Sequence, residues 1–199
     1  ALVSEAGTPL LSDPGFRLVR AALERDIEIV ALPGPSAITT ALIGSGLPTG
    51  RFLFSGFLPR KRGERQRLLA GVSTQTASLV FFETPHRLRA SLADMVEILG
   101  SDRPLAICRE LTKLHEEIWR GTLQQALESW SERTLRGEFT LVVGGVEAAE
   151  EPWSQSRVEQ ALVQAIDRGM TARDAVKQVT ILSGWPKREV YAVVQHLNL

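Results

Sequence analysis

The sequence predicts an α/β fold, and three features support this prediction. Short apolar runs alternate with amphipathic segments along residues 1–145. Two of the apolar runs end in loops rich in glycine and proline. The chain has 199 residues, of which 44% are apolar, so it can bury a sizeable core. The single cysteine, Cys108, excludes a disulfide framework and a cysteine-based zinc site, and it is typical of a protein of the reducing cytoplasm.

The first fifty residues are expected to form two strands and two helices. Apolar runs at 1–4 and 27–32 predict buried strands. Between them, Asp13 is a candidate cap and Pro14 suits the first turn of a helix. A second helix is expected over 36–43. Because the chain opens on a strand with no element ahead of it, we expect this sequence to be a fragment.

The middle of the chain repeats the same alternation. We expect extended segments at 52–57, 79–82, 105–108 and 139–143, a helix from Thr84 to Gly100, and a helix that opens on the capping box Thr122–Gln125. Strands that alternate with helices at this spacing predict a mixed or mostly parallel sheet.

The composition changes after residue 146, where acidic residues replace the apolar pattern and predict a linker. Three short helices follow, at about 156–168, 171–183 and 186–197, and resemble a helix-turn-helix module. The expected parts are the remainder of an N-terminal α/β lobe at 1–48, a second α/β lobe at 49–146, a linker at 147–155 and a helical module at 156–199.

The charges balance, with 23 basic and 23 acidic side chains, which argues against a module that coats nucleic acid. One local cluster is nevertheless basic, and it comprises Arg60, Lys61, Arg62, Arg65 and Arg67. It could bind the phosphates of a nucleic acid, or it could be a solvated loop and helix face. The uncharged stretch 29–50 contains three prolines, so we expect no membrane span there.

The loops 6–9 and 33–37 are the first candidate binding elements. Glycine lets a ligand approach the backbone, and Thr8 and Ser36 add hydroxyl groups; the alternative is that both loops are ordinary turns. Neither loop has the spacing of a nucleotide phosphate site, so a ligand without a phosphate chain fits better. The charged residues Arg109, Glu110 and Lys113 follow a predicted strand and suit a cleft or a surface ion pair. The three histidines lack the spacing of metal ligands, so no metal is expected.

Six motifs in order then show a resemblance to a known family. They are VSEAGTPLLSDPG, LPGPSAITTAL, SGLPT, FSGFLPRK, LVFFETPHRL and RELTK. Together they resemble the ribosomal small-subunit methyltransferase I family of the tetrapyrrole-methylase superfamily. The resemblance covers residues 1–145, and the C-terminal helices match more loosely.

The resemblance implies a fold of two α/β lobes that hold S-adenosylmethionine between them. It implies 2′-O-methylation of the ribose of a cytidine in small-subunit ribosomal RNA, with that RNA or the ribosomal subunit as partner and a homodimer as the assembly. The cofactor-binding residues that it implies are Ala6, Gly7, Thr8, Leu11, Ser36, Ala37, Glu83, Leu111 and Thr140. Glu110 is then the candidate base, with Arg109 and Lys113 as cationic helpers, and the basic cluster at 60–67 would bind the RNA.

Two features of the family are absent from this sequence: the PTPIGNL-like and AEDTR-like motifs that precede the VSEAGTP segment. We therefore expect that much of the first lobe is lacking and that this chain alone is a weak or inactive catalyst. Two alternatives remain open: a tetrapyrrole methyltransferase with the same cofactor loops, and a non-catalytic remnant that binds RNA or a partner through residues 156–199.

Overall fold

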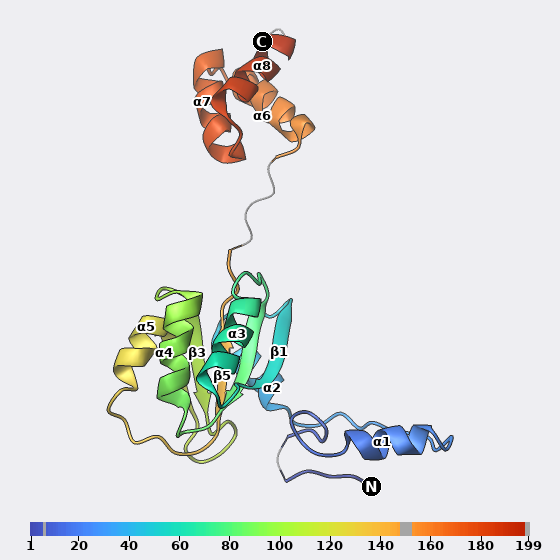
Figure 1. Cartoon of the computed structure of the whole chain (residues 1–199). Coiled ribbons are helices and arrows are strands. Elements are labelled where there is room, and N and C mark those ends of the chain that lie inside the picture. Colours follow the sequence, from blue (N-terminus) through green and yellow to red (C-terminus); the bar gives the residue numbers. More distant parts are fainter. Residues whose placement is uncertain (6, 148–152, 198–199) are drawn as a thin grey trace. The chain divides into compact units, whose positions relative to one another are not determined.

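The computed structural model of the chain describes residues 1–5, 7–147 and 153–197. The chain divides into two compact units, Ala1–Glu147 and Ala148–Leu199 (Figure 1). The expected linker at 147–155 lies largely outside the described residues. The expected boundary between two lobes at residue 48 falls within the first unit and stays a prediction.

The first unit is built on a five-stranded sheet with the order β1-β2-β5-β3-β4. Its strands are β1 (Phe52–Phe57), β2 (Ser78–Glu83), β3 (Pro104–Arg109), β4 (Glu117–Thr122) and β5 (Phe139–Val143). Only β1 and β2 pair in parallel, and the other three pairs are antiparallel. The sequence predicted a mixed or a mostly parallel sheet, and the sheet is mixed.

Helices cover both faces of this sheet (Figure 1). They are α2 (Ala37–Ser45), α3 (Arg62–Val72), α4 (Leu88–Leu99) and α5 (Leu123–Ser129). Side chains alternate between the two faces along a strand. Leu79 and Phe81 thus join the core under α3, α4 and α5, while Val80 packs with Ile38 and Leu42 of α2 on the opposite face.

The local signals for helix ends are confirmed at two places. Thr122 caps α5, where its Oγ1 accepts from the Gln125 N–H at 3.3 Å and its own N–H donates to Gln125 Oε1 at 3.0 Å. Gly100 ends α4 with a φ of 97°, a conformation that suits glycine. The regular part of α4 begins at Leu88, four residues later than the Thr84 signal, because residues 85–87 form a turn.

The predicted strands at 1–4 and 27–32 are wrong, because both segments are irregular. A strand needs a neighbour to bind its N–H and C=O groups, and no strand lies beside either segment in the described part of the chain. Their apolar side chains are correspondingly exposed, as for Val3 at 83% and Leu32 at 81%. The helix between them, α1 (Phe16–Leu23), does form, but its N-terminal cap is Gly15 and not Asp13.

Two elements, α3 and β4, have no counterpart in the sequence prediction. The sequence of α3 is strongly charged, and its two buried residues are Arg65 and Leu69, so it shows little apolar periodicity. The strand β4 lies at the edge of the sheet and is only partly buried, so its sequence resembles a loop. Pairing with β3 over all six residues, from Arg109 opposite Glu117 to Pro104 opposite Thr122, makes it a strand.

The second unit contains the three expected helices, α6 (Gln155–Asp167), α7 (Ala172–Ser183) and α8 (Lys187–Leu197). They enclose a core of their own, which includes Val158, Leu162, Val176 and Val190. Helices α6 and α7 begin at capping hydroxyl groups, those of Ser154 and Thr171. None of the described helices has both the length and the apolar content that a membrane span requires.

Replacement of Phe81, which is fully buried in the interior strand β2, should destabilise the first unit strongly. Phe81→Ala removes a large side chain from a tightly packed core and should lower the free energy of unfolding by about 3 to 5 kcal/mol. Urea unfolding followed by circular dichroism measures this change. The control is Leu114→Ala, since Leu114 is 93% exposed and its loss should change stability by less than about 0.5 kcal/mol. Equal effects of the two substitutions would contradict this account of the core.

Candidate cleft at the edge of the sheet

A cavity of about 1050 Å³ opens where several strands meet at one edge of the sheet. The strands β1, β2 and β3 end there, and β5 begins there, because β5 runs antiparallel to both β2 and β3. Phe139 consequently lies opposite Glu83 on one side and opposite Arg109 on the other. The crevice beyond the carboxyl ends of strands is the usual place for a ligand in open α/β sheets.

The cavity is lined by eight of the nine residues that the sequence singled out for the cofactor. The ninth, Ala6, lies outside the described residues. The eight are Gly7, Thr8, Leu11, Ser36, Ala37, Glu83, Leu111 and Thr140. They come from five separate stretches of the chain, so only the fold brings them together.

The two N-terminal loops are tied to each other at the mouth of the cavity. The hydroxyl of Thr8 donates a hydrogen bond to the carbonyl of Pro35 at 2.8 Å. Ser36 is the N-terminal cap residue of α2, and Ala37 is the first residue of that helix. The site thus combines hydroxyl groups, the start of a helix and the apolar side chains of Leu11 and Leu111, a mixture typical of small-molecule sites.

The carboxylate of Glu83 holds the structure together at the end of β2. Its side chain is fully buried, and its oxygens accept hydrogen bonds from the Thr84 N–H at 2.7 Å and from the Ser91 hydroxyl at 2.5 Å. Arg87 Nη2 lies 2.8 Å from Glu83 Oε1. A buried charge requires such partners, and here they fix the turn between β2 and α4. Glu83 therefore fixes the turn beside the cleft, and it also lines the cleft itself.

The carboxylate of Glu110 anchors a loop on the opposite side of the cleft. Its Oε1 accepts from the Glu138 N–H at 2.9 Å and from Lys113 Nζ at 3.1 Å. The hydrogen bond from Glu138 and the one from Lys113 hold the pKa of Glu110 below its ordinary value of 4.5. Glu110 is consequently a weak proton acceptor at neutral pH, and these contacts favour a role in holding the loop.

Glycine is required at position 137 because Glu110 packs against it. Gly137 has a φ of 88°, and a Cβ at this position would lie 2.5 Å from Cγ of Glu110. Glu110 and Thr112 themselves have positive φ values, 49° and 63°. The loop 110–113 is therefore a strained turn whose shape depends on the Glu110 contacts.

Of the three residues expected to help catalysis, only Lys113 lines the cavity; Arg109 and Glu110 lie beside it. Glu138 and Glu110, the nearest carboxylates, raise the pKa of Lys113, so its ammonium group stays charged. Arg109 Nε donates to the carbonyl of Arg136 at 2.8 Å, and its Nη1 lies 3.6 Å from Glu117.

Cys108 is buried, as expected of a core residue, and it also reaches the cavity wall. Burial raises the pKa of its thiol to about 11. The thiol is therefore protonated at neutral pH and is a poor nucleophile. Among the described residues no group of histidine, cysteine and carboxylate side chains could hold a metal ion.

The basic cluster at 60–67 divides into two kinds of residue. Arg60, Lys61 and Arg67 are exposed, and Lys61 Nζ lies 3.3 Å from Glu64 Oε1. Arg62 is also exposed, but it donates to Asp94 at 3.1 Å and to Glu97 at 2.9 Å. Arg65 is 4% exposed and binds Asp94, which does not fit direct contact with RNA phosphates.

Sequence reasoning missed several residues that line the cavity. Among them are Phe82 on the second face of β2 and the residues just before β5, Gly137 and Glu138. The strand β5 was expected, but its direction was not, so nothing in the sequence assigned its first residues to this edge. A glycine before an apolar strand was the only available signal.

The comparisons with known proteins agree with the α/β fold. The family described as Tetrapyrrole (Corrin/Porphyrin) Methylases matches residues 1–127, which is more than half of the chain. The chain thus belongs to this class of methylases.

Curated relatives identify the family more closely. The ribosomal RNA small subunit methyltransferase I of Synechocystis sp. is 43% identical over all of this chain and 71% of its own length. The protein of the same name from Halalkalibacterium halodurans is 45% identical over 97% of this chain and 68% of its own. The one from Bacillus subtilis is 40% identical over 96% of this chain and 67% of its own length. The chain belongs to the ribosomal RNA small subunit methyltransferase I family.

Solved structures share the fold at low sequence identity. The methyltransferase CobJ superposes with a TM-score of 0.54 at 19% identity, over 70% of this chain and 62% of that one. Diphthine synthase superposes with a TM-score of 0.53 at 15% identity, over 70% of this chain and 57% of that one. The chain spans about three fifths of the length of these structures, and at such identities the likeness concerns the fold alone.

The stabilising effect of Glu110 should depend on pH. Because its pKa is lowered in the folded state, its contribution is present above the ordinary value of 4.5 and is lost as the pH falls through the lower folded value. Wild type should therefore be more stable than Glu110→Gln at pH 7, and the difference should shrink toward pH 3. Urea unfolding between pH 7 and pH 3 measures the free energy of unfolding of both proteins. Glu132→Gln, at an exposed position, serves as the control. A difference that stays constant with pH would contradict the role of the carboxylate.

Proposed function

We propose that this chain takes part in S-adenosylmethionine-dependent 2′-O-methylation of the ribose of a cytidine in small-subunit ribosomal RNA. The observation that carries the proposal is the cleft at the strand ends, lined by the eight described residues expected at the cofactor. The names of the relatives support the RNA substrate, since each is a ribosomal RNA small subunit methyltransferase I. The single buried cysteine suits the cytoplasm, where ribosomes are found.

The cleft fits a ligand of the size and chemistry of S-adenosylmethionine. Its volume, about 1050 Å³, is at the upper end of ordinary small-molecule sites and leaves room for part of a nucleotide. The apolar Leu11 and Leu111 suit the adenine ring, and the hydroxyls of Thr8, Ser36 and Thr140 suit its polar edges and the ribose. When bound, the cofactor supplies a methyl group that is already activated by a positively charged sulfur.

The remaining task of the chain is to align the ribose and to favour loss of its proton. A ribose hydroxyl is a weak acid, and a nearby positive charge stabilises its deprotonated form. Lys113, which lines the cleft, is the candidate for this charge, and Arg109 adds positive charge beside it. The hydrogen bonds of Glu110 support a role in holding Lys113 in place better than a role as the base that accepts the proton.

The RNA would bind along the exposed cations at the end of β1. Arg60 and Lys61 are exposed there, Arg67 is exposed on α3, and Phe57, three residues before Arg60, lines the cleft. A homodimer remains part of the proposal. The edge strand β1 supports it, since its Phe52, 45% exposed, and Leu53, 37% exposed, offer an apolar surface.

The direct test is a methyl-transfer assay with labelled S-adenosylmethionine. Small ribosomal subunits that lack the modification and a reduced porphyrin are offered to this chain in parallel. We expect label on a ribose of the RNA. Label on the porphyrin would instead establish a tetrapyrrole methyltransferase. Label on neither acceptor would favour a non-catalytic binding protein.

Filling the cleft should weaken cofactor binding without unfolding the protein. Ala37→Leu adds a larger side chain at the start of α2, where Ala37 lines the cavity, and should weaken S-adenosylmethionine binding at least about tenfold by steric exclusion. Isothermal titration calorimetry measures the affinity. The matched control is Ala90→Leu, the same change at an exposed position of α4 outside the cavity, which should leave the affinity unchanged. Unaltered binding to Ala37→Leu would rule out this cleft as the cofactor site.

A further inference from the structure

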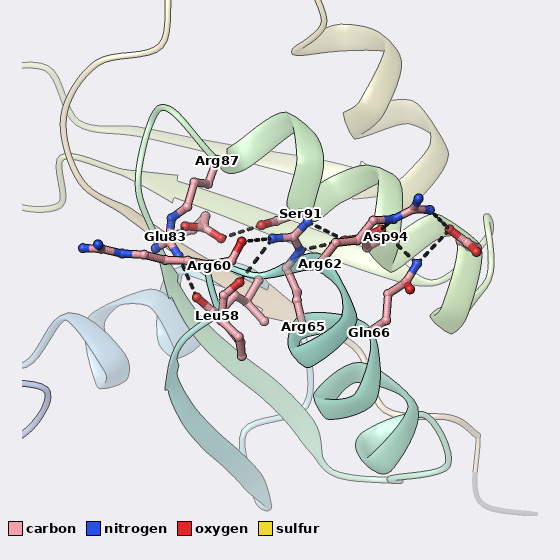
Figure 2. Close-up of polar contacts among 11 residues, drawn as sticks. Leu58, Arg60, Arg62, Arg65, Gln66, Glu83, Arg87, Ser91 and Asp94 are labelled. Atoms are coloured by element: carbon pink, nitrogen blue, oxygen red, sulfur yellow. Dashed lines mark hydrogen bonds and ion pairs between the residues drawn. The ribbon is translucent and has the colours of Figure 1, made fainter.

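The loop after β1 is held by side chains at three consecutive backbone carbonyls (Figure 2). The carbonyl of Leu58 accepts from Arg87 Nη1 at 2.8 Å. The carbonyls of Pro59 and Arg60 accept from Arg65 Nη1 at 3.2 and 3.3 Å. Loops of this kind ordinarily leave such groups to water. Two guanidinium groups thus fix the path of the chain between β1 and α3.

Buried carboxylates in turn fix both guanidinium groups. Arg65, with 5% of its side chain exposed, lies 2.6 Å from Asp94 Oδ2, and the Asp94 side chain is 3% exposed. Figure 2 shows Arg65 between Asp94 and the loop carbonyls. Arg87 is held by the fully buried Glu83. Each arginine therefore joins a carboxylate of the core to a carbonyl of the loop.

Stability alone does not account for this arrangement. Buried ion pairs are on average no more stabilising than apolar packing of the same volume, because both charges must be removed from water. They do fix direction, since a guanidinium donates along several set directions in one plane. The arrangement is suited to holding the loop in a single conformation.

The loop presents two cations just beyond the end of β1. Arg60 is exposed, and the side chain of Lys61 is 82% exposed. Both follow the end of β1, where Phe57 lines the cavity. We call Arg60 and Lys61 the basic tip. It begins three residues after Phe57, which lines the cleft in which, under the proposed function, the ribose would be methylated.

We propose that Arg65 and Arg87, fixed by Asp94 and Glu83, are positioning residues that hold the basic tip in the geometry in which it binds phosphates of the RNA substrate. The inference rests on the proposed function, because it takes RNA as the ligand of the tip. A tip that is already ordered loses less conformational entropy on binding than a mobile one. Loss of the support should therefore weaken RNA binding although the charge of the tip is unchanged.

The test uses Arg65→Lys in the whole chain. Lysine keeps the positive charge beside Asp94, but it has no planar fork with which to reach Asp94 and two carbonyls together. The affinity for naked small-subunit ribosomal RNA should fall roughly tenfold, because a mobile tip loses more conformational entropy when it binds. The affinity for S-adenosylmethionine should not change.

Arg103→Lys is the matched control for a purely structural effect. Arg103 also donates to backbone carbonyls, those of Gly144 at 2.6 Å and Ser73 at 3.3 Å, but at the opposite edge of the sheet. Its replacement should lower the melting temperature while RNA affinity stays within about twofold of wild type. A loss of RNA affinity as large as that of Arg65→Lys would overturn the proposal.

A double-mutant cycle shows whether Arg65 acts through the tip. The double substitution Arg60→Ala/Lys61→Ala should weaken RNA binding. It should also make the slope of log affinity against log salt concentration shallower, by about 0.7 to 0.9 for each lost phosphate contact. In that background, Arg65→Lys should have no further effect on affinity. An equal loss in both backgrounds would overturn the proposal.

The outcomes also separate this inference from the proposed function. If the tip substitutions weaken RNA binding but Arg65→Lys does not, only the positioning role is wrong. If wild type fails to bind the RNA, or if the tip substitutions change neither affinity nor salt slope, RNA binding at this loop is wrong and the positioning role with it.

Discussion

The central strand β5 organises the whole first unit. It pairs antiparallel with β2 on one side and with β3 on the other, and all five of its residues are buried. Its direction brings its first residues to the edge where β2 and β3 end. The cleft depends on this pairing, because no other described strand of the sheet has its N-terminal end beside the ends of both neighbours. Reversal of this one strand would move Phe139 and Thr140 away from the cleft.

The cleft itself is shaped by two carboxylates that bind other groups of the protein. Glu83 fixes the turn after β2, and Glu110 fixes the strained loop after β3. Both carboxylates stabilise backbone at the rim, and the direct action on a ligand that was expected of them stays a prediction. Among titratable residues that line the cleft, Lys113 keeps a positive charge. Rigid strand-end loops of this kind suit a reaction in which alignment of two bound partners supplies much of the rate.

The basic segment after β1 shows how one sequence feature can serve two purposes. Its five cations look alike in sequence, yet the structure buries Arg65 among carbonyls and a carboxylate while Arg60 and Lys61 remain exposed. The distinction arises because α3 packs against α4, which places Arg65 beside Asp94, 29 residues away in sequence. No local pattern identifies such a partner.

The sequence by itself determined the α/β class, most helices and strands of the middle of the chain, the helical module and the loops of the cleft. These features depend on local signals: apolar periodicity, capping residues such as Thr122, and glycine next to hydroxyl residues. Only the tertiary structure decided the direction of β5, the strand identity of β4 and the irregular course of residues 1–4 and 27–32. An extended segment becomes a strand when a neighbour satisfies its backbone groups, and that neighbour is set by contacts distant in sequence.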